Sequence, residues 1–139
     1  TLFRSSHEGK SLSLYRSGIG KCLLAWQPAA VRKAIIEQLI WEQATPTTIT
    51  KPQQLKDELE RIRQRGWSFD NGEDYPDVRC VAAPVFNASN ELTAAISVVG
   101  TRLQINEENR DYLAGKAISC AKDISRLLGW KSPFDSLAS

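Results

Sequence analysis

Polar and apolar residues alternate near the start of the chain, over Ser11 to Tyr15. A period of two is typical of a half-buried strand. Residues 1–6 are compatible with a partner strand, and residues 7–10 between them have the composition of a turn. The pattern therefore predicts a hairpin, and its abrupt start leads us to expect a further segment upstream.

Apolar residues then recur at helical spacing in three places. A short helix is expected over residues 20–27, and Pro28 suits the first turn of a second helix. Thr50 and Gln53 have the pattern of a capping box that opens a third helix, which Gly66 is suited to end. The expected buried positions of the second and third helices are Val31, Ile35, Ile36, Leu39, Leu55, Leu59 and Ile62.

The pattern changes to β character after residue 66. The expected strands are residues 67–70, 78–86 and 92–99. The turn-like residues 87–90 join the last two strands as a hairpin. A long helix is expected over residues 107–128, with Asn106 as its cap and Gly129 at its end. With neither a repeat nor a linker, the sequence predicts one α+β domain.

Composition places the chain among soluble globular proteins. Hydrophobic residues make up 42% of its 139 residues and charged residues 24%, which disfavours disorder. The net charge of +2 is too small to indicate a nucleic-acid surface by itself. No apolar run approaches the ~18 residues of a membrane span, and no signal peptide opens the chain, so we expect a cytoplasmic protein.

The three cysteines, Cys22, Cys80 and Cys120, stand far apart, each in an apolar stretch. We expect buried free thiols in a reducing compartment rather than disulfides. No Cys-x-x-Cys pair occurs and His7 is the sole histidine, which leaves almost no support for a metal site. No cofactor or metal is predicted.

The expected hairpin puts a thiol and a hydroxyl on one face of the sheet. If the turn closes symmetrically about residues 87–90, Cys80 lies opposite Ser97. Val78 then lies opposite Val99 on the same face. Small apolar and polar groups arranged in this way can line a small cavity. A bulge at the turn would shift the register and undo the pairing.

Asp70 adds a charge near this face, at the end of the preceding strand. Each of these polar residues also has an ordinary structural interpretation. Cys80 can be a small buried hydrophobe, and Ser97 can satisfy a neighbouring carbonyl. Asp70, which Asn-Gly follows, can be a turn residue. The residues alone therefore only suggest a pocket.

A second candidate is the glycine-rich segment Ser17-Gly-Ile-Gly-Lys-Cys22 before the first expected helix. Free backbone N–H groups and the helix dipole can hold an anion at such a place. The segment is not a P-loop, because Tyr15 and Cys22 stand where that motif needs Gly and Ser or Thr. A helix-start turn without a ligand is the alternative.

Six short motifs follow one another along the chain. They are Ser17-Gly-Ile-Gly-Lys-Cys-Leu-Leu-Ala25, Thr45-Pro-Thr-Thr-Ile-Thr50, Arg65-Gly-Trp67, Gly72-Glu-Asp-Tyr75, Val78-Arg-Cys-Val-Ala-Ala-Pro-Val85 and Ala95-Ile-Ser-Val-Val-Gly100. This ordered set resembles the C-terminal effector-binding domain of IclR-type bacterial transcription regulators. The resemblance implies a GAF-like (profilin-like) antiparallel sheet flanked by helices over residues 1–130, followed by a tail over residues 131–139.

The resemblance also implies a ligand site for a small carboxylate or sugar-acid effector. The family's ligand contacts and apolar wall positions fall on Gly18, Ile19, Asp70, Cys80, Ser97, Leu12 and Val78, with Arg4 nearby. Gly18 and Ile19 would contribute backbone N–H groups. Val99 departs from the family pattern, because a characterised member has a second serine there.

By the same resemblance, the protein is a homodimer or homotetramer that represses a carbohydrate or sugar-acid operon. It contacts operator DNA only through an N-terminal winged helix-turn-helix domain absent from this chain, and it is not an enzyme. One alternative is a GAF-like thiol reductase that uses Cys80, which lacks a nearby base or second cysteine in sequence. The other is an oligomerisation module without a ligand, built on the charged helix over residues 53–65 and the C-terminal helix.

Overall fold

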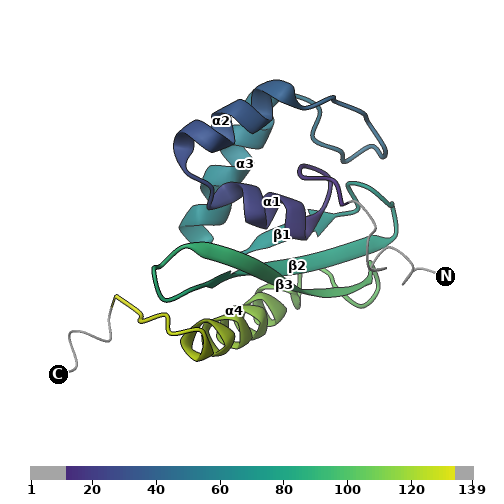
Figure 1. The fold of residues 1–139 in the computed structure, drawn as a ribbon. Helices are drawn as coiled ribbons and strands as arrows, with labels where there is room; N and C mark the ends of the chain where they lie inside the picture. The colour runs from purple at the N-terminus through teal and green to yellow at the C-terminus, as the bar shows by residue number, and fades with distance from the viewer. Residues whose placement is uncertain (1–11, 134–139) are drawn as a thin grey trace.

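The computed structural model describes residues 12–133, in which helices cover both faces of a three-stranded sheet (Figure 1). The elements in chain order are α1 (Gly18–Ala25), α2 (Ala29–Gln38), α3 (Pro52–Arg65), β1 (Ser68–Asn71), β2 (Val78–Phe86), β3 (Leu92–Thr101) and α4 (Arg110–Leu127). The sheet has the order β1-β2-β3, and both pairs are antiparallel. The first three helices lie on one face and α4 on the other (Figure 1). The predicted α+β class is confirmed.

The prediction of an N-terminal hairpin is wrong for the part of it that the structure describes. Residues 1–11, with the first expected strand, the turn and Arg4, lie outside the described residues. Residues 14–16 form a turn instead of a strand. The Ser13 hydroxyl accepts the N–H groups of Tyr15 and Arg16, and the Ser13 carbonyl accepts the Ser17 hydroxyl at 2.6 Å. These local bonds replace the ladder that a strand would need.

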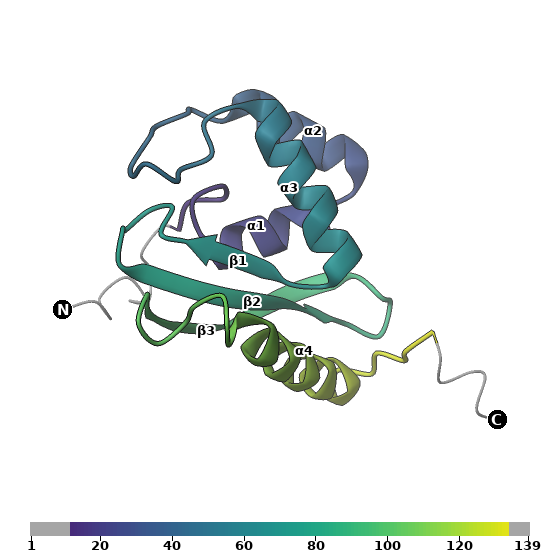
Figure 2. The ribbon, with the colours of Figure 1, turned by 180° about the vertical axis from the view of Figure 1, so that it is seen from behind.

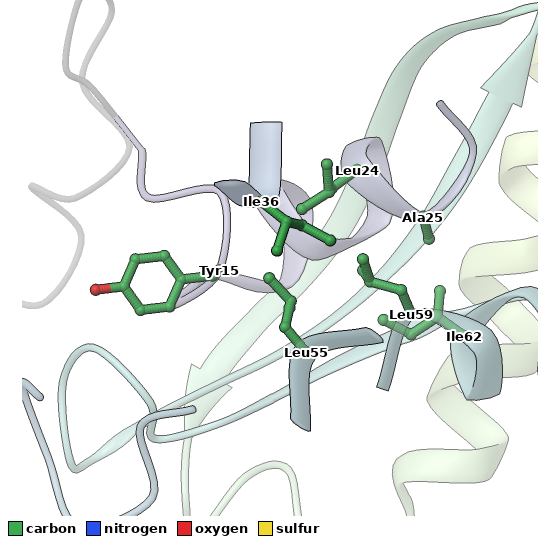
Figure 3. Packing of buried hydrophobic residues seen from close by; sticks show 7 residues of the cluster. All are labelled: Tyr15, Leu24, Ala25, Ile36, Leu55, Leu59 and Ile62. Atoms are coloured by element: carbon green, nitrogen blue, oxygen red, sulfur yellow. The ribbon is translucent and has the colours of Figure 1, made fainter. Parts of the chain in front are cut away.

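A hydrophobic core lies between α1, α2 and α3, on the face of the sheet opposite to α4 (Figure 3). Its buried members are Tyr15, Leu24, Ala25, Ile36, Leu55, Leu59 and Ile62. The buried stripe expected for α3 is therefore confirmed, and Gly66 ends that helix with a left-handed φ of 89°. One of the buried positions expected for α2 is wrong, because Val31 is 44% exposed. The helix packs on the core through Ile35 and Ile36, and Leu39 packs there directly after the helix.

The capping box expected at the start of α3 is wrong. The helix begins at Pro52, and its cap residue Lys51 makes no side-chain cap bond. Proline suits the first position of a helix because its missing N–H would have no helical partner there. The Thr50 N–H instead donates to Oε1 of Gln54 at 3.4 Å.

A bulge in the hairpin of β2 and β3 gives the two strands a different register from the predicted one. Cys80 pairs with Val99, and Ser97 pairs with Ala82. The hairpin closes on Leu92, and the register slips near Val85 and Phe86. The predicted Cys80–Ser97 pairing is therefore wrong by two residues. A shift of two preserves the faces of a strand, so Cys80 and Ser97 still share one side of the sheet.

α4 covers the opposite face of the sheet through small residues. Ala117 and Ala121 pack against Ala83 and Val85 of β2, which allows a close approach of helix and sheet. The helix starts at Arg110 instead of residue 107, because the Asn106 side chain accepts N–H groups within the preceding turn. After the last helical residue, Gly129 takes a left-handed φ of 89°, as the sequence predicts for the helix end.

Candidate functional site

The start of α1 lies directly over the thiol of Cys80. Ser17 caps the helix by accepting the Gly20 N–H at 2.9 Å. A Cβ atom added at Gly18 would lie 2.8 Å from the Cys80 sulfur, so the helix can approach this closely only because residue 18 is glycine. Ile19 packs against the same buried cluster as Cys80. The structure therefore brings Gly18, Ile19 and Cys80 together.

Two further predicted site residues lie on the same side of the sheet. Asp70 on β1 pairs with Cys80 on β2, and Asp70 is only 4% exposed. Ser97 on β3 lies diagonally across from Cys80, and its hydroxyl lowers the pKa of the thiol against the larger effect of burial. Asp70, Cys80 and Ser97 thus form a polar row across all three strands, under the glycine-rich start of α1.

Val78 and Val99 lie at the margin of this row. Val78 begins β2, two residues before Cys80, and is half-buried. Val99, which is 41% exposed, places an apolar group opposite Cys80 on β3. Leu12 is 50% exposed and forms no closed wall within the described residues. Arg4 lies outside them.

Asp70 also takes part in the turn that follows β1. Its Oδ1 atom accepts the Glu73 N–H at 2.9 Å. The pKa of Asp70 is raised to about 6, mainly by burial and also by the nearby carboxylates of Glu73 and Asp74, while the Glu73 N–H and the Lys21 charge oppose the shift. The turn role that the sequence suggested is therefore present, and it fixes this carboxyl at the edge of the polar row.

The thiols near the site are held in their neutral form. Burial raises the pKa of Cys80 to about 12, and it raises the pKa of Cys22 to about 12 as well. The nucleophilic form of cysteine is the thiolate, so the Cys80 thiol at neutral pH can donate or accept a hydrogen bond but is a poor nucleophile. The expectation of three buried thiols is wrong for Cys120, which is exposed on α4.

A buried ion pair beneath the site was missed by the sequence reasoning. The Lys21 Nζ atom lies 2.9 Å and 3.0 Å from the two carboxylate oxygens of Glu73 and donates to the Phe69 carbonyl at 2.6 Å. Lys21 is 1% exposed and Glu73 4%. The available signal was a lysine inside a short helix that is otherwise apolar, because a buried charge requires a partner.

The threonine-rich segment holds the turn that carries Glu73. The hydroxyl groups of Thr45 and Thr47 donate to the Gly72 carbonyl, and that of Thr48 donates to the Glu73 carbonyl at 2.6 Å. In the sequence this segment stood out only as one of the six motifs that carry the family resemblance. Its structural role is to satisfy the carbonyls of the turn that supports Asp70.

The three-stranded antiparallel sheet with helices on both faces, and the polar row beneath a glycine-rich helix start, define a small domain of the α+β class. Residues 1–126 match the family described as bacterial transcriptional regulator IclR C-terminal. The chain therefore belongs to the IclR family, whose effector-binding domain it represents. None of the helices in the described part of the chain is both long and apolar enough to cross a membrane.

Known relatives share both sequence and fold with this chain. It is 84% identical over 139 residues to the HTH-type transcriptional regulator RhmR of Escherichia coli K12, of which it covers 54%. The crystal structure of the Thermotoga maritima IclR is 34% identical, with a TM-score of 0.85, over 90% of this chain and 51% of that one. The chain spans about half the length of the curated relatives it matches.

One solved relative contains a bound ligand. The inducer-binding domain of the Acinetobacter transcription factor PobR, as a double mutant, was solved in complex with 3-hydroxybenzoic acid. It is 24% identical, with a TM-score of 0.79, over 87% of this chain and 70% of that one. At this identity the likeness shows the shared fold alone.

Proposed function

We propose that this domain binds a small carboxylate metabolite, such as a sugar acid, on the α1 face of the sheet. The observation that carries the proposal is the convergence of Asp70, Cys80 and Ser97 beneath the start of α1. The proposed site comprises Gly18, Ile19, Asp70, Cys80, Ser97, Leu12 and Val78, and the sequence resemblance adds Arg4, which lies outside the described residues.

The backbone at the start of α1 suits a carboxylate. Ser17 takes the Gly20 N–H through its hydroxyl and the Lys21 N–H through its carbonyl. This leaves the N–H groups of Gly18 and Ile19 for a ligand, as far as the described residues extend. The positive end of the helix dipole favours an anion at this place. The ligand carboxylate would accept these two N–H groups.

The side chains of the polar row suit the rest of a hydroxylated ligand. The Ser97 hydroxyl and the Asp70 carboxyl can exchange hydrogen bonds with hydroxyl or carbonyl groups. Val78 and Val99 provide apolar contacts at the margin. Asp70 also disfavours ligands with excess negative charge when it is ionised. The chemistry therefore fits a small hydroxy or keto acid better than a highly charged anion.

In the full-length protein, binding would change operator affinity through a separate DNA-binding domain. The similarity to HTH-type regulators supports the DNA-binding part of this arrangement. The proposal also includes a cytoplasmic homodimer or homotetramer that represses a carbohydrate or sugar-acid operon, as the sequence resemblance implies. Coupling of about 1–3 kcal/mol between the two sites would change operator affinity roughly five- to 150-fold. The neutral Cys80 thiol argues against the thiol-reductase alternative.

A thermal-unfolding screen of sugar acids and other small carboxylates tests the proposal. A ligand present at about 100 times its Kd adds about 2.7 kcal/mol to the free energy of unfolding. We expect Ser97→Ala to weaken the binding of any such ligand, whereas Ser119→Ala, at an exposed serine of α4, leaves it unchanged. Equal binding by both variants, or no stabilising carboxylate, would overturn the proposal in favour of an oligomerisation module.

A further inference from the structure

A cleft lies along the edge of β1 that has no neighbouring strand in the described part of the chain. Figure 2 shows this edge beneath α3, with α4 on the other side of the sheet. The cleft has a volume of about 520 Å³. Its walls come from α3, from residues 46–49 of the threonine-rich segment, from β1 and from Arg110 at the start of α4. No residue of the proposed effector site lines it.

Positive side chains outnumber the carboxylates that line this cleft. The basic residues are Lys21, Arg61, Arg65 and Arg110, and the acidic residues are Asp57, Glu58 and Glu73. Four positive charges against three negative charges leave an excess of one. Because the buried Glu73 neutralises Lys21, the excess belongs to the three arginines.

The carboxylate of Glu58 forms ion pairs with two of these arginines. Glu58 lies 3.1 Å from Arg61 and 3.2 Å from Arg65, and it also lies 3.6 Å from Lys21. Burial lowers the pKa of Arg65, and the charges of Arg110 and Arg61 lower it further against the opposing effect of Glu58. The guanidinium groups are therefore close enough to repel one another, and an anion between them would relieve that repulsion.

Among the three arginines that line the cleft, Arg110 has the longest ion-pair distance. Its Nε atom is buried and has no hydrogen-bond partner in the described part of the chain. Its guanidinium lies 5.4 Å from the centre of the Phe69 ring, and its ion pair is with Asp111, at 3.7 Å, on an exposed side chain. A buried donor without an acceptor is costly, and a ligand oxygen in the cleft would supply that acceptor.

We propose that this cleft binds the oxyanion group of a small metabolite, either a phosphate or a carboxylate. Arginine is suited to this role because its planar fork of N–H donors matches both groups. Arg110 and Arg61 would hold the anion, while Arg65 remains tied to Glu58 and to the Trp67 carbonyl. The cleft shares no lining residue with the proposed effector site, although Glu73 of the cleft donates its N–H to Asp70 of that site.

Calorimetric titration of the purified chain with inorganic phosphate and with citrate, against chloride at matched ionic strength, tests the proposal. We expect saturable binding of at least one of the two anions, and about tenfold or more weaker binding in Arg110→Gln. Arg102→Gln is the matched control, because Arg102 is an exposed arginine paired with Asp77 outside the cleft. Phosphate binding alone identifies a phosphate ligand, and citrate binding alone a carboxylate.

Ser97→Ala separates this proposal from the effector site. Anion binding that survives Ser97→Ala and is lost in Arg110→Gln belongs to the cleft. Binding that is lost in Ser97→Ala and kept in Arg110→Gln contradicts the cleft and supports the effector site instead. Equal responses of Arg110→Gln and Arg102→Gln, or a chloride response equal to that of both anions, would also overturn the proposal.

Discussion

Gly18 and Cys80 approach so closely that a methyl group on the glycine would lie 2.8 Å from the cysteine sulfur. We predict that Gly18→Ala lowers the free energy of unfolding by about 1–3 kcal/mol, because overpacking forces the helix away from the sheet. The loss should shrink in the Gly18→Ala/Cys80→Ala double variant, where the sulfur is gone. Urea denaturation of the single and double variants measures this coupling.

Gly20 offers a control for that experiment. A Cβ atom at Gly20 would clash with the Ser13 carbonyl, the Leu14 backbone and the Ser17 hydroxyl, none of which belongs to Cys80. Gly20→Ala should therefore be destabilising whether or not Cys80 is present. If Cys80→Ala rescued both glycine variants equally, the specific contact between Gly18 and Cys80 would not be the cause.

The buried pair of Lys21 and Glu73 predicts a large effect of removing one partner. Lys21→Met leaves the buried Glu73 carboxylate uncompensated, and we expect a loss of about 3–5 kcal/mol in the free energy of unfolding. Removing the exposed pair partner Arg102, as Arg102→Gln, should cost about 0–1 kcal/mol. Similar losses in the two variants, measured by urea denaturation, would show that the Lys21 pair is not buried in solution.

The raised pKa of Asp70 predicts a pH dependence of stability. In the folded chain this pKa is about 6, above the ordinary value of 3.8, so the folded state binds more protons than the unfolded state between these values. The contribution of Asp70 is therefore fully present below about pH 4 and is lost as the pH rises through about 6. It amounts to about 3 kcal/mol.

Asp70→Asn isolates this contribution, because the amide keeps an oxygen that can accept the Glu73 N–H but does not titrate. Urea denaturation between pH 4 and 7 should show the stability of the wild-type chain falling relative to that of the variant. If the free energy of unfolding of the wild-type chain instead rose with pH relative to that of Asp70→Asn, the pKa of Asp70 would be lowered by folding, not raised.

The three cysteines should differ sharply in reactivity. Cys120 is exposed, whereas Cys22 and Cys80 are buried with pKa values of about 12. We expect one fast-reacting thiol per native chain toward a water-soluble disulfide reagent at pH 8, and three after denaturation. Cys120→Ser should abolish the fast phase. A fast phase that persists in Cys120→Ser would place a reactive thiol at the sheet and revive the enzyme alternative.

Local patterns predicted much of this fold. The strand Val78–Phe86 was expected with its observed bounds, because β-branched and small apolar residues run between two clear turn segments. The buried stripe of α3 followed from its helical spacing, and Gly66 followed from the need for a left-handed residue after the helix. These features depend only on residues close in sequence.

Features that depend on distant partners could not be predicted in this way. The two-residue error at Cys80 and Ser97 arose from the longer turn and the bulge, which change the count of residues without changing the pattern of faces. The Lys21–Glu73 pair joins residues 52 positions apart, and no local periodicity reports such a contact. The polar row itself was predicted because it depends on strand faces, which the two-residue shift preserved.

The central claim is that a small carboxylate binds at the start of α1, over the polar row. Its most direct test is a ¹H–¹⁵N NMR titration of the chain with the carboxylate that stabilises it most in the thermal screen. We predict that the largest shifts fall on the backbone N–H groups of Gly18 and Ile19, with smaller shifts at Cys80 and Ser97. Unchanged Gly18 and Ile19 signals at saturation would contradict the account.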